Sequence, residues 1–389
     1  MSDARGPDAA PTGAVAVLWF AGTVSTLLLF AFDIGHLRGL LVPEHGVLIG
    51  RDFVNIWVGG KLAWGGRLDI LYDPQAYWAA ARGMFAGLLP HNYSYPPQSL
   101  IPAALLSLLP YPAALATWLV ATTGLFLIAA RPFMRGLPLW MAALTPGALI
   151  NIWAGQYGLL AGALWLFAFA AMDRRQGQAG LSAALLTVKP HLGLLIPIIW
   201  IARRRWTALG VAVAGTLAIV AVSAALFGTG IWIDYLTKAP ETQRAILEAP
   251  GDQLYFRMMP TTLVALRGYP AMLGIAVQAA TALAALALLW RARKAGAGDL
   301  AFIAATATFL ILPYAFDYDM TVATLGFGLT LATRWRRLAA WEAPVLCVAY
   351  LLPGRMIAFG AIPVGVAPLV LLGALWVQVR HASPQESAV

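Results

Sequence analysis

The chain has 389 residues, of which 60% are hydrophobic and only 11% are charged, whereas soluble domains carry about 25% charged residues. A water-soluble protein of this size could not bury so much apolar surface, so lipid must be the solvent for much of the chain. The composition therefore excludes a soluble globular domain and predicts an integral membrane protein. The single cysteine, Cys347, excludes an internal disulfide and a thiolate metal site.

The net charge of +9 would suit a nucleic-acid partner, but its distribution argues against one. Basic residues form short runs between apolar segments, as in loops kept on the cytoplasmic side of a membrane. They are Arg131, Arg135, Arg174, Arg175, Arg203, Arg204, Arg205, Arg291, Arg293, Lys294, Arg334, Arg336, Arg337 and Arg380. Most acids lie in the alternate loops. We expect a multi-pass protein of a bacterial inner (cytoplasmic) membrane, with its acidic loops on the external, periplasmic face.

The first hundred residues contain one span and one long polar interval. Residues 1–13 are polar and rich in Pro, Gly and Ala, which predicts a disordered cytoplasmic tail. Residues 14–32 are uncharged and form a retained first span, since no signal-peptide cleavage site follows them. Residues 35–95 then form a large external loop. Within it, segments 53–64 and 74–89 are mixed polar and aromatic, which predicts two amphipathic helices on the bilayer surface.

Two later regions contain apolar segments too short to cross a bilayer. Residues 96–109 end at Pro110-Tyr111-Pro112 and predict a half-helix or re-entrant element. Residues 180–188 and 192–201 are each about half a span, with Lys189-Pro190-His191 between them. This pattern predicts two half-helices that enter from the cytoplasm and turn near mid-membrane. The proline breaks the helix there, so a protein-lined or hydrated cavity must satisfy the freed backbone groups.

The remaining apolar segments complete the bundle. They cover residues 113–130, 137–150, 157–171, 206–227, 271–290, 300–312, 320–332, 343–352 and 362–379, with an external segment at 228–268. The sequence predicts an all-α polytopic membrane protein with about 10–12 transmembrane helices, including short elements. We expect roughly ten full spans in a single domain over residues 14–380, and a cytoplasmic tail at 381–389. No internal repeat is evident, which disfavours an inverted-repeat transporter.

Asp52 is the first candidate functional residue, because it is a carboxylate directly after the first span. It could cap the helix that follows it, or it could be solvated and inert. Asn55 lies one helical turn further on and Trp57 follows, which together make a polar and aromatic face that suits a sugar.

Lys189 is the more specific signal, since a lysine in the middle of an apolar hairpin costs a few kcal/mol unless it is paired or hydrated. One interpretation is a structural ion pair with Asp317 or Asp319. The other is a clamp for a phosphate, which we favour because ionisable groups at this depth mark functional sites. His191 could bind a metal ion, but no other histidine has a useful spacing, so we expect no metal.

Four further segments contain polar residues at external positions. Asn151 and Gln156 follow a predicted span and either cap a turn or bind hydroxyl groups. Tyr95 belongs to an aromatic, proline-rich segment that either anchors the chain at the interface or contacts a sugar. Asp317, Tyr318 and Asp319 follow Pro313, and the paired acids could bind a divalent cation or sugar hydroxyls, or lie in an exposed loop. Arg257 and Arg244, in the later external segment, either bind a phosphate or are simply solvated.

The ordered set of these motifs resembles glycosyltransferase family 87, which belongs to the GT-C superfamily of enzymes that use polyprenol-phosphate sugars. The residues that carry the resemblance are Asp52, Gly66 with Leu71-Tyr72-Asp73-Pro74, Tyr95-Pro96-Pro97, Gly155-Gln156, Gly180 leading to Lys189-Pro190, the basic 203–206 and 313–318. They extend over residues 15–335. Many members of the family have a histidine after the late proline, whereas residues 316–319 of this chain contain none.

The resemblance implies an inverting transfer of a sugar, typically mannose, from a polyprenyl-phosphate-sugar to a hydroxyl of a lipid or glycan acceptor on the external face. Asp52 would be the general base, and Lys189, His191 and Arg257 would bind the donor phosphate. The candidates for contacts with the sugar or the acceptor are Asn55, Tyr95, Asn151, Gln156, Asp317 and Tyr318. The expected partners are the donor, the acceptor and membrane lipids, with no cofactor other than the lipid-linked co-substrate.

Two other functional classes compete with this hypothesis. A transporter or a flippase of lipid-linked glycans also needs many spans and an intramembrane cation, and a non-catalytic envelope scaffold needs only the spans. In an enzyme, Asp52 and Lys189 should converge on one cavity. In a transporter, the polar residues should line a path between the two faces of the membrane.

Overall fold

The computed structural model describes residues 6, 8–355 and 361–384, so residues 1–5, 7 and 385–389 of the two predicted tails lie outside the described residues. α-Helices dominate this part of the chain, and β1 (Leu41–Val42) pairs with β2 (Val47–Leu48) in a short antiparallel hairpin. A helix pairs its own backbone N–H and C=O groups, which is necessary in a membrane because lipid tails offer no hydrogen-bonding partners. The all-α polytopic class predicted from the sequence is therefore confirmed.

The helices are α1 Thr12–His36, α2 Phe53–Trp64, α3 Pro74–Met84, α4 Leu100–Leu106, α5 Tyr111–Ala130, α6 Pro146–Ala154, α7 Gly158–Ala171, α8 Gln176–Leu186, α9 Leu195–Ala202, α10 Trp206–Phe227, α11 Gly230–Glu248, α12 Thr262–Ala265, α13 Ala271–Arg291, α14 Ala297–Ile311, α15 Thr321–Arg334, α16 Glu342–Leu351 and α18 Ala361–Arg380. Short 3₁₀ turns lie between them: η1 Leu68–Ile70, η2 Pro97–Ser99, η3 Arg131–Phe133, η4 Leu139–Leu144, η5 Pro190–Gly193, η6 Leu254–Met258, η7 Asp317–Asp319 and η8 Trp335–Arg337.

Only some of the predicted spans are full spans. Four helices among the described residues, α1, α5 with its extension to Phe133, α10 and α13, are long and apolar enough to cross a membrane, and six shorter apolar helices accompany them. A 14-residue helix such as α7 is about 21 Å long, less than the roughly 30 Å of a hydrocarbon core. The prediction of about ten full spans was wrong for this reason, although the four long and six short helices together make ten apolar helices.

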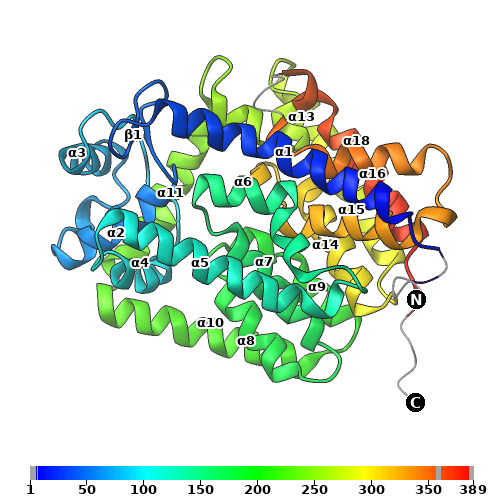
Figure 1. Cartoon of the computed structure of the whole chain (residues 1–389). Coiled ribbons are helices and arrows are strands. Elements are labelled where there is room, and N and C mark those ends of the chain that lie inside the picture. The colour runs from blue at the N-terminus through cyan, green and yellow to red at the C-terminus, as the bar shows by residue number, and fades with distance from the viewer. Residues whose placement is uncertain (1–5, 7, 356–360, 385–389) are drawn as a thin grey trace.

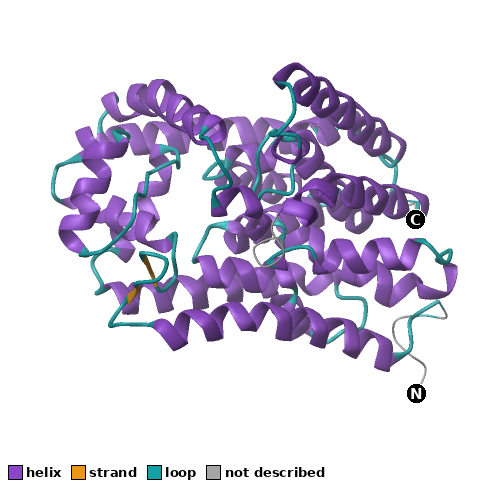
Figure 2. Ribbon diagram, turned by 90° about the horizontal axis from the view of Figure 1, so that it is seen from above, coloured by secondary structure: helices purple, strands orange, loops and turns teal. Residues whose placement is uncertain are grey.

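The basic loops gather at one end of the bundle, which we call the basic end. There Arg135 and Arg334 both pair with Asp299 at the start of α14, and Arg203 donates to the carbonyl of Arg293. The start of α1 lies at this end too, because the amide of Ala10 donates to the carbonyl of Ala332. The hairpin and helices α2, α3 and α4 lie at the opposite end (Figures 1 and 2).

The structure also corrects three details of the sequence analysis. Helix α2 has the predicted bounds, but most of its residues are buried by other parts of the protein, so it is not an exposed amphipathic helix. Its Gly59 packs against the ring of Tyr93 and its Gly60 against the backbone of Ala103 in α4, approaches that only a residue without a Cβ permits. The second predicted helix, 74–89, is shorter than expected, because α3 ends at Met84. The external segment 228–268 contains a 19-residue helix, α11, that was not predicted.

Candidate active site

A cavity of about 1360 Å³ opens at the end opposite the basic loops. The connections between three pairs of short helices, α6 with α7, α8 with α9 and α14 with α15, line it, and α11 lines another wall. The residues at these turns are the polar ones that the sequence analysis singled out. Because the short helices end before the long ones do, the bundle leaves this space at their ends.

Asp52 faces the cavity from the turn before α2. Its backbone amide donates to the carbonyl of Ala154 at 3.0 Å, and Gly155, in the left-handed conformation with φ 64°, lets the backbone of Gly50 approach closely. The side chain of Asp52 makes no capping hydrogen bond to α2, so the helix-cap interpretation does not describe it. Instead, its Oδ2 accepts a hydrogen bond of 2.8 Å from Nε2 of Gln156.

An ion pair holds the turn that carries Asp52. Arg51 has an unusual positive φ of 40° for a residue other than glycine. Its guanidinium pairs with Asp33 near the end of α1 at 2.7 Å and stacks over the ring of Trp153 at 3.7 Å. Both charged side chains are buried. The pair was not predicted, because Asp33 and Arg51 are 18 residues apart and come together only through the packing of α1 against this turn.

Gln156 connects Asp52 to the aromatic side of the cavity. The hydroxyl of Tyr95 donates to Oε1 of Gln156 at 2.8 Å, while Nε2 of the same amide contacts Asp52 and, at 3.5 Å, the hydroxyl of Tyr318. Burial, reinforced by Asp52, raises the pKa of Tyr95 well above its ordinary value, so its hydroxyl remains a donor. The amide therefore points its nitrogen at the carboxylate.

Lys189 lies across the cavity in an ion pair. Its Nζ is 2.7 Å and 2.8 Å from the two carboxylate oxygens of Asp319, and both side chains are almost fully buried. The same ammonium lies 4.9 Å from the centre of the Tyr318 ring. Burial raises the pKa of Asp319 while the charge of Lys189 lowers it. Of the two partners that the sequence analysis considered, Asp319 is the one present, and the His191 ring lies beside the pair, 6.0 Å from Tyr314.

Three predicted site residues do not line the cavity. Asn151 is fully buried and bonds to the carbonyl of Tyr318 at 3.0 Å, which joins α6 to η7. Asp317 points away and accepts from the amide of Gly354 at 3.0 Å, and burial raises its pKa to about 7. Arg257 makes an exposed ion pair with its near neighbour Asp252. Their positions do not support the contacts with sugar, acceptor or phosphate that we expected of them.

The other predicted site residues come together around the cavity. They are Asp52, Asn55, Tyr95, Gln156, Lys189, His191 and Tyr318. His91, Asn92 and Ser94 also line the cavity and were not predicted as site residues, although they directly precede Tyr95 in the sequence. Among the described residues, no group of three or more His, Cys, Asp or Glu side chains is placed to hold a metal ion.

Comparison with known proteins agrees with the geometry. The family model described as glycosyltransferase family 87 matches residues 93–313, which is more than half of the 389 residues. No curated protein and no solved structure matches the chain. The matched range contains Tyr95, Gln156 and Lys189 and begins after Asp52. The chain therefore belongs to glycosyltransferase family 87, and the protein is a multi-pass membrane glycosyltransferase.

Proposed function

We propose that the protein transfers a sugar from a polyprenyl-phosphate-sugar to a hydroxyl group of a lipid or glycan acceptor. The observation that carries this proposal is that Asp52 and Lys189 face one cavity from different walls. A carboxylate and a cation across one space are what a displacement at a sugar phosphate requires. A transporter would instead distribute its polar groups along a path between two faces.

Asp52 is the general base in this scheme. Gln156 occupies its Oδ2, so Oδ1 takes the proton from the acceptor hydroxyl as that oxygen attacks the anomeric carbon. The new carbon–oxygen bond forms while the bond from the anomeric carbon to the phosphate oxygen breaks. The bonding electron pair leaves with the phosphate, so the sugar is inverted at the anomeric carbon and the polyprenyl phosphate is released.

Lys189 stabilises the departing phosphate. An ammonium group has three N–H donors, and Asp319 accepts at most two of them through its two oxygens. The third donor is available to a phosphate oxygen in the cavity, where a positive charge counters the growing negative charge of the leaving group. His191, beside the pair, provides a second donor. Asn55 and Tyr318 are the candidates for contacts with sugar hydroxyls.

A second, apolar crevice supports a lipid-linked donor. It has a volume of about 380 Å³, lies between α8, α9 and α10, and shares Pro190 with the main cavity. The outer face of α10 is exposed along most of its length, as expected of a helix that contacts lipid. A polyprenyl chain in this crevice would place its phosphate next to Lys189. Mannose as the transferred sugar follows the family resemblance.

The orientation in the membrane follows from charge. The loops at the basic end suit the cytoplasmic side of a bacterial inner membrane, and the cavity at the other end would then face the periplasm. Protease accessibility of a tag placed in the segment around Glu44, which is exposed beside the cavity end, tests this orientation in spheroplasts.

The test of the reaction is sugar transfer from radiolabelled polyprenyl-phosphate-mannose, glucose and arabinose donors in membranes that contain the wild type or Asp52→Asn. The asparagine keeps the size of the side chain and cannot accept the proton. We expect product from the wild type and a loss of about 10²–10⁴-fold in the variant at equal amounts of folded protein. Equal product from both proteins would remove Asp52 from the mechanism, and no product from any donor would reject the proposed reaction.

A further inference from the structure

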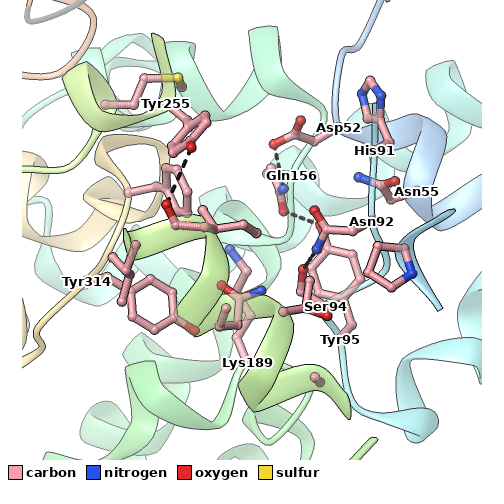
Figure 3. Close-up of a pocket in the computed structure, with 18 of the residues that line it drawn as sticks. Asp52, Asn55, His91, Asn92, Ser94, Tyr95, Gln156, Lys189, Tyr255 and Tyr314 are labelled. Carbon is pink, nitrogen blue, oxygen red and sulfur yellow. Dashed lines mark hydrogen bonds between the residues drawn. The ribbon is translucent and has the colours of Figure 1, made fainter. Parts of the chain in front are cut away.

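The walls of the cavity differ in their chemistry. Lys189 and Tyr314 lie on the side of the ion pair, whereas Asn55, His91 and Asn92 lie near Asp52 and away from that side (Figure 3). We call the second wall, formed by Asn55, His91, Asn92 and Ser94, the amide wall. Its four side chains carry no formal charge when the histidine is neutral, and all of them reach the cavity.

The hydrogen bonds within the structure determine what His91 offers. Its Nδ1 lies 2.7 Å from the carbonyl oxygen of Leu89, and a carbonyl can only accept, so Nδ1 carries the hydrogen. In the neutral ring, Nε2 is then a lone-pair acceptor. The ring is half-buried at the edge of the cavity, so this acceptor is available to the hydroxyl of a ligand.

The neighbouring polar groups on the amide wall are oriented as well. Nδ2 of Asn92 donates to Oγ of Ser94 at 2.7 Å, which leaves the amide oxygen of Asn92 as an acceptor and the serine hydroxyl as a donor. The hydroxyl of Tyr77 donates to Oδ1 of Asn55 at 3.1 Å, which leaves the amide nitrogen of Asn55 as a donor. Alternating donors and acceptors match sugar hydroxyls, because each hydroxyl both donates and accepts.

Charge argues against an anionic ligand on this wall. Among the described residues, the arginines and lysines that line the cavity are Arg51, Lys189 and Arg244. Arg51 is already paired with Asp33 and Arg244 with Glu248, and Lys189 lies on the other wall (Figure 3). The carboxylate of Asp52 lies near Asn55 and His91 (Figure 3), where it repels a phosphate and attracts the proton of a neutral hydroxyl.

We propose that the amide wall is the acceptor subsite and that it takes the uncharged, hydroxyl-rich sugar end of a glycan or glycolipid, rather than a phosphate-bearing headgroup. The proposal rests on the proposed function, since it assigns the acceptor of that reaction. It places the attacking hydroxyl beside Asp52 and the anionic donor on the side of Lys189. The two substrates are then sorted by charge within a single cavity.

Binding of small glycosides to the full chain in nanodiscs tests the subsite without turnover. The probes are methyl mannoside, methyl glucoside, methyl galactoside and methyl mannoside 6-phosphate, with Kd measured by saturation-transfer NMR titration. We expect at least one uncharged glycoside to bind and the phosphorylated one to bind at least ten-fold more weakly. His91→Ala and Asn92→Ala should each raise Kd about five- to ten-fold through lost hydrogen bonds. Gln253→Ala, an exposed residue outside the cavity, is the control and should bind as the wild type does.

Three results would overturn the subsite: no binding of any uncharged glycoside, equal or tighter binding of the phosphorylated one, or wild-type Kd values in both wall variants. Binding of the glycosides is measured without a donor, so it tests the subsite separately from the reaction. A wild-type protein that binds glycosides at this wall, yet transfers no sugar from any polyprenyl donor, would support the subsite and reject the proposed function.

Discussion

Buried polar groups occur at both ends of the bundle, but their bonding differs. At the basic end, Asp299 accepts from Arg135 at 2.7 Å, from Arg334 at 2.6 Å and from the amide of Ser383 at 2.8 Å. At the cavity end, Asp52 accepts one side-chain hydrogen bond, from Gln156, and its other oxygen makes no bond that the described residues supply. The carboxylate of Asp299 is therefore surrounded by protein hydrogen-bond donors, whereas the carboxylate of Asp52 faces the cavity.

This difference distinguishes an acid that stabilises the fold from an acid that can react with a substrate. A buried network in which every group is satisfied stabilises one arrangement and has nothing left for a ligand. A carboxylate held from one side by an oriented donor, with lone pairs exposed to a cavity, is arranged to accept a proton from a substrate. The following predictions test whether the two ends differ in this way, and they run from the largest expected effect on sugar transfer to the smallest.

Replacing Lys189 should have the largest effect on the cavity end. Lys189→Met removes the cation beside the leaving phosphate, and we expect transfer to fall by about 10²-fold or more. It also leaves Asp319 buried without its partner, which costs about 3–5 kcal/mol of folding stability. The double variant Lys189→Met/Asp319→Leu is the matched control, because removing both charges should restore stability. Transfer per folded molecule at the wild-type rate in the double variant would show that Lys189 does not assist the leaving group.

Gln156→Ala should have an intermediate effect, because Gln156 acts as a positioning residue for Asp52. Without its amide, the carboxylate loses the donor that orients it, and the hydroxyl of Tyr95 loses its acceptor. We expect kcat to fall about ten-fold with little change in the KM for the donor. Tyr95→Phe removes only the hydrogen bond from the tyrosine hydroxyl to Gln156, so it should lower kcat less than Gln156→Ala does. A change in KM alone would mean that Gln156 binds the substrate and does not position the base.

Much of this arrangement could be predicted from the sequence, and its limits have physical causes. Helix α2 and the break at Pro110 follow from local signals, namely apolar runs and proline, and so does the turn at Lys189. The pairing of Asp33 with Arg51 depends on how two segments pack in three dimensions, which apolar periodicity does not encode. Helix α11 was missed because it is polar in part and contains Pro240, which costs a backbone hydrogen bond and disfavours a helix.

The predicted span lengths failed for a related reason. An apolar run shows that a segment avoids water, but it does not say whether lipid or other helices surround it. Helix α14 is buried along nearly all of its length inside the bundle, whereas α10 exposes most of its side chains. Both were read as spans from hydropathy alone. The cavity exists because buried helices such as α14 can be short, since they need not match the thickness of the bilayer.

A change at the basic end should affect stability and leave chemistry intact. Asp299→Ala leaves Arg135 and Arg334 close together without their shared carboxylate, and we expect a loss of about 3–5 kcal/mol of stability. Transfer by the protein that remains folded should be within two-fold of the wild type, because Asp299 lies at the end away from the cavity. Thermal unfolding and transfer per folded molecule, measured on the same preparation, test this. A selective loss of transfer would mean that the two networks are coupled.

Asp317 lies at the cavity end but points away from the cavity, so we expect it to behave as a structural acid. Its Oδ2 accepts from Gly354, and its buried Oδ1 has no partner among the described residues. Burial raises its pKa to about 7, from about 3.9 in an unfolded chain. A raised pKa in an acid means that its contribution to stability is fully present below about pH 4 and is lost as pH rises through about 7.

The wild type should therefore unfold at a lower temperature at pH 8 than at pH 5, and Asp317→Asn should flatten this dependence. The difference between the two proteins at pH 8 is at most about 4 kcal/mol, and it is smaller to the extent that the new amide nitrogen is itself left unsatisfied. Transfer should be unchanged, because the side chain does not reach the substrates. Parallel pH profiles of unfolding in the two proteins would contradict this assignment. A loss of transfer in Asp317→Asn would instead return Asp317 to the group of residues that contact the sugar.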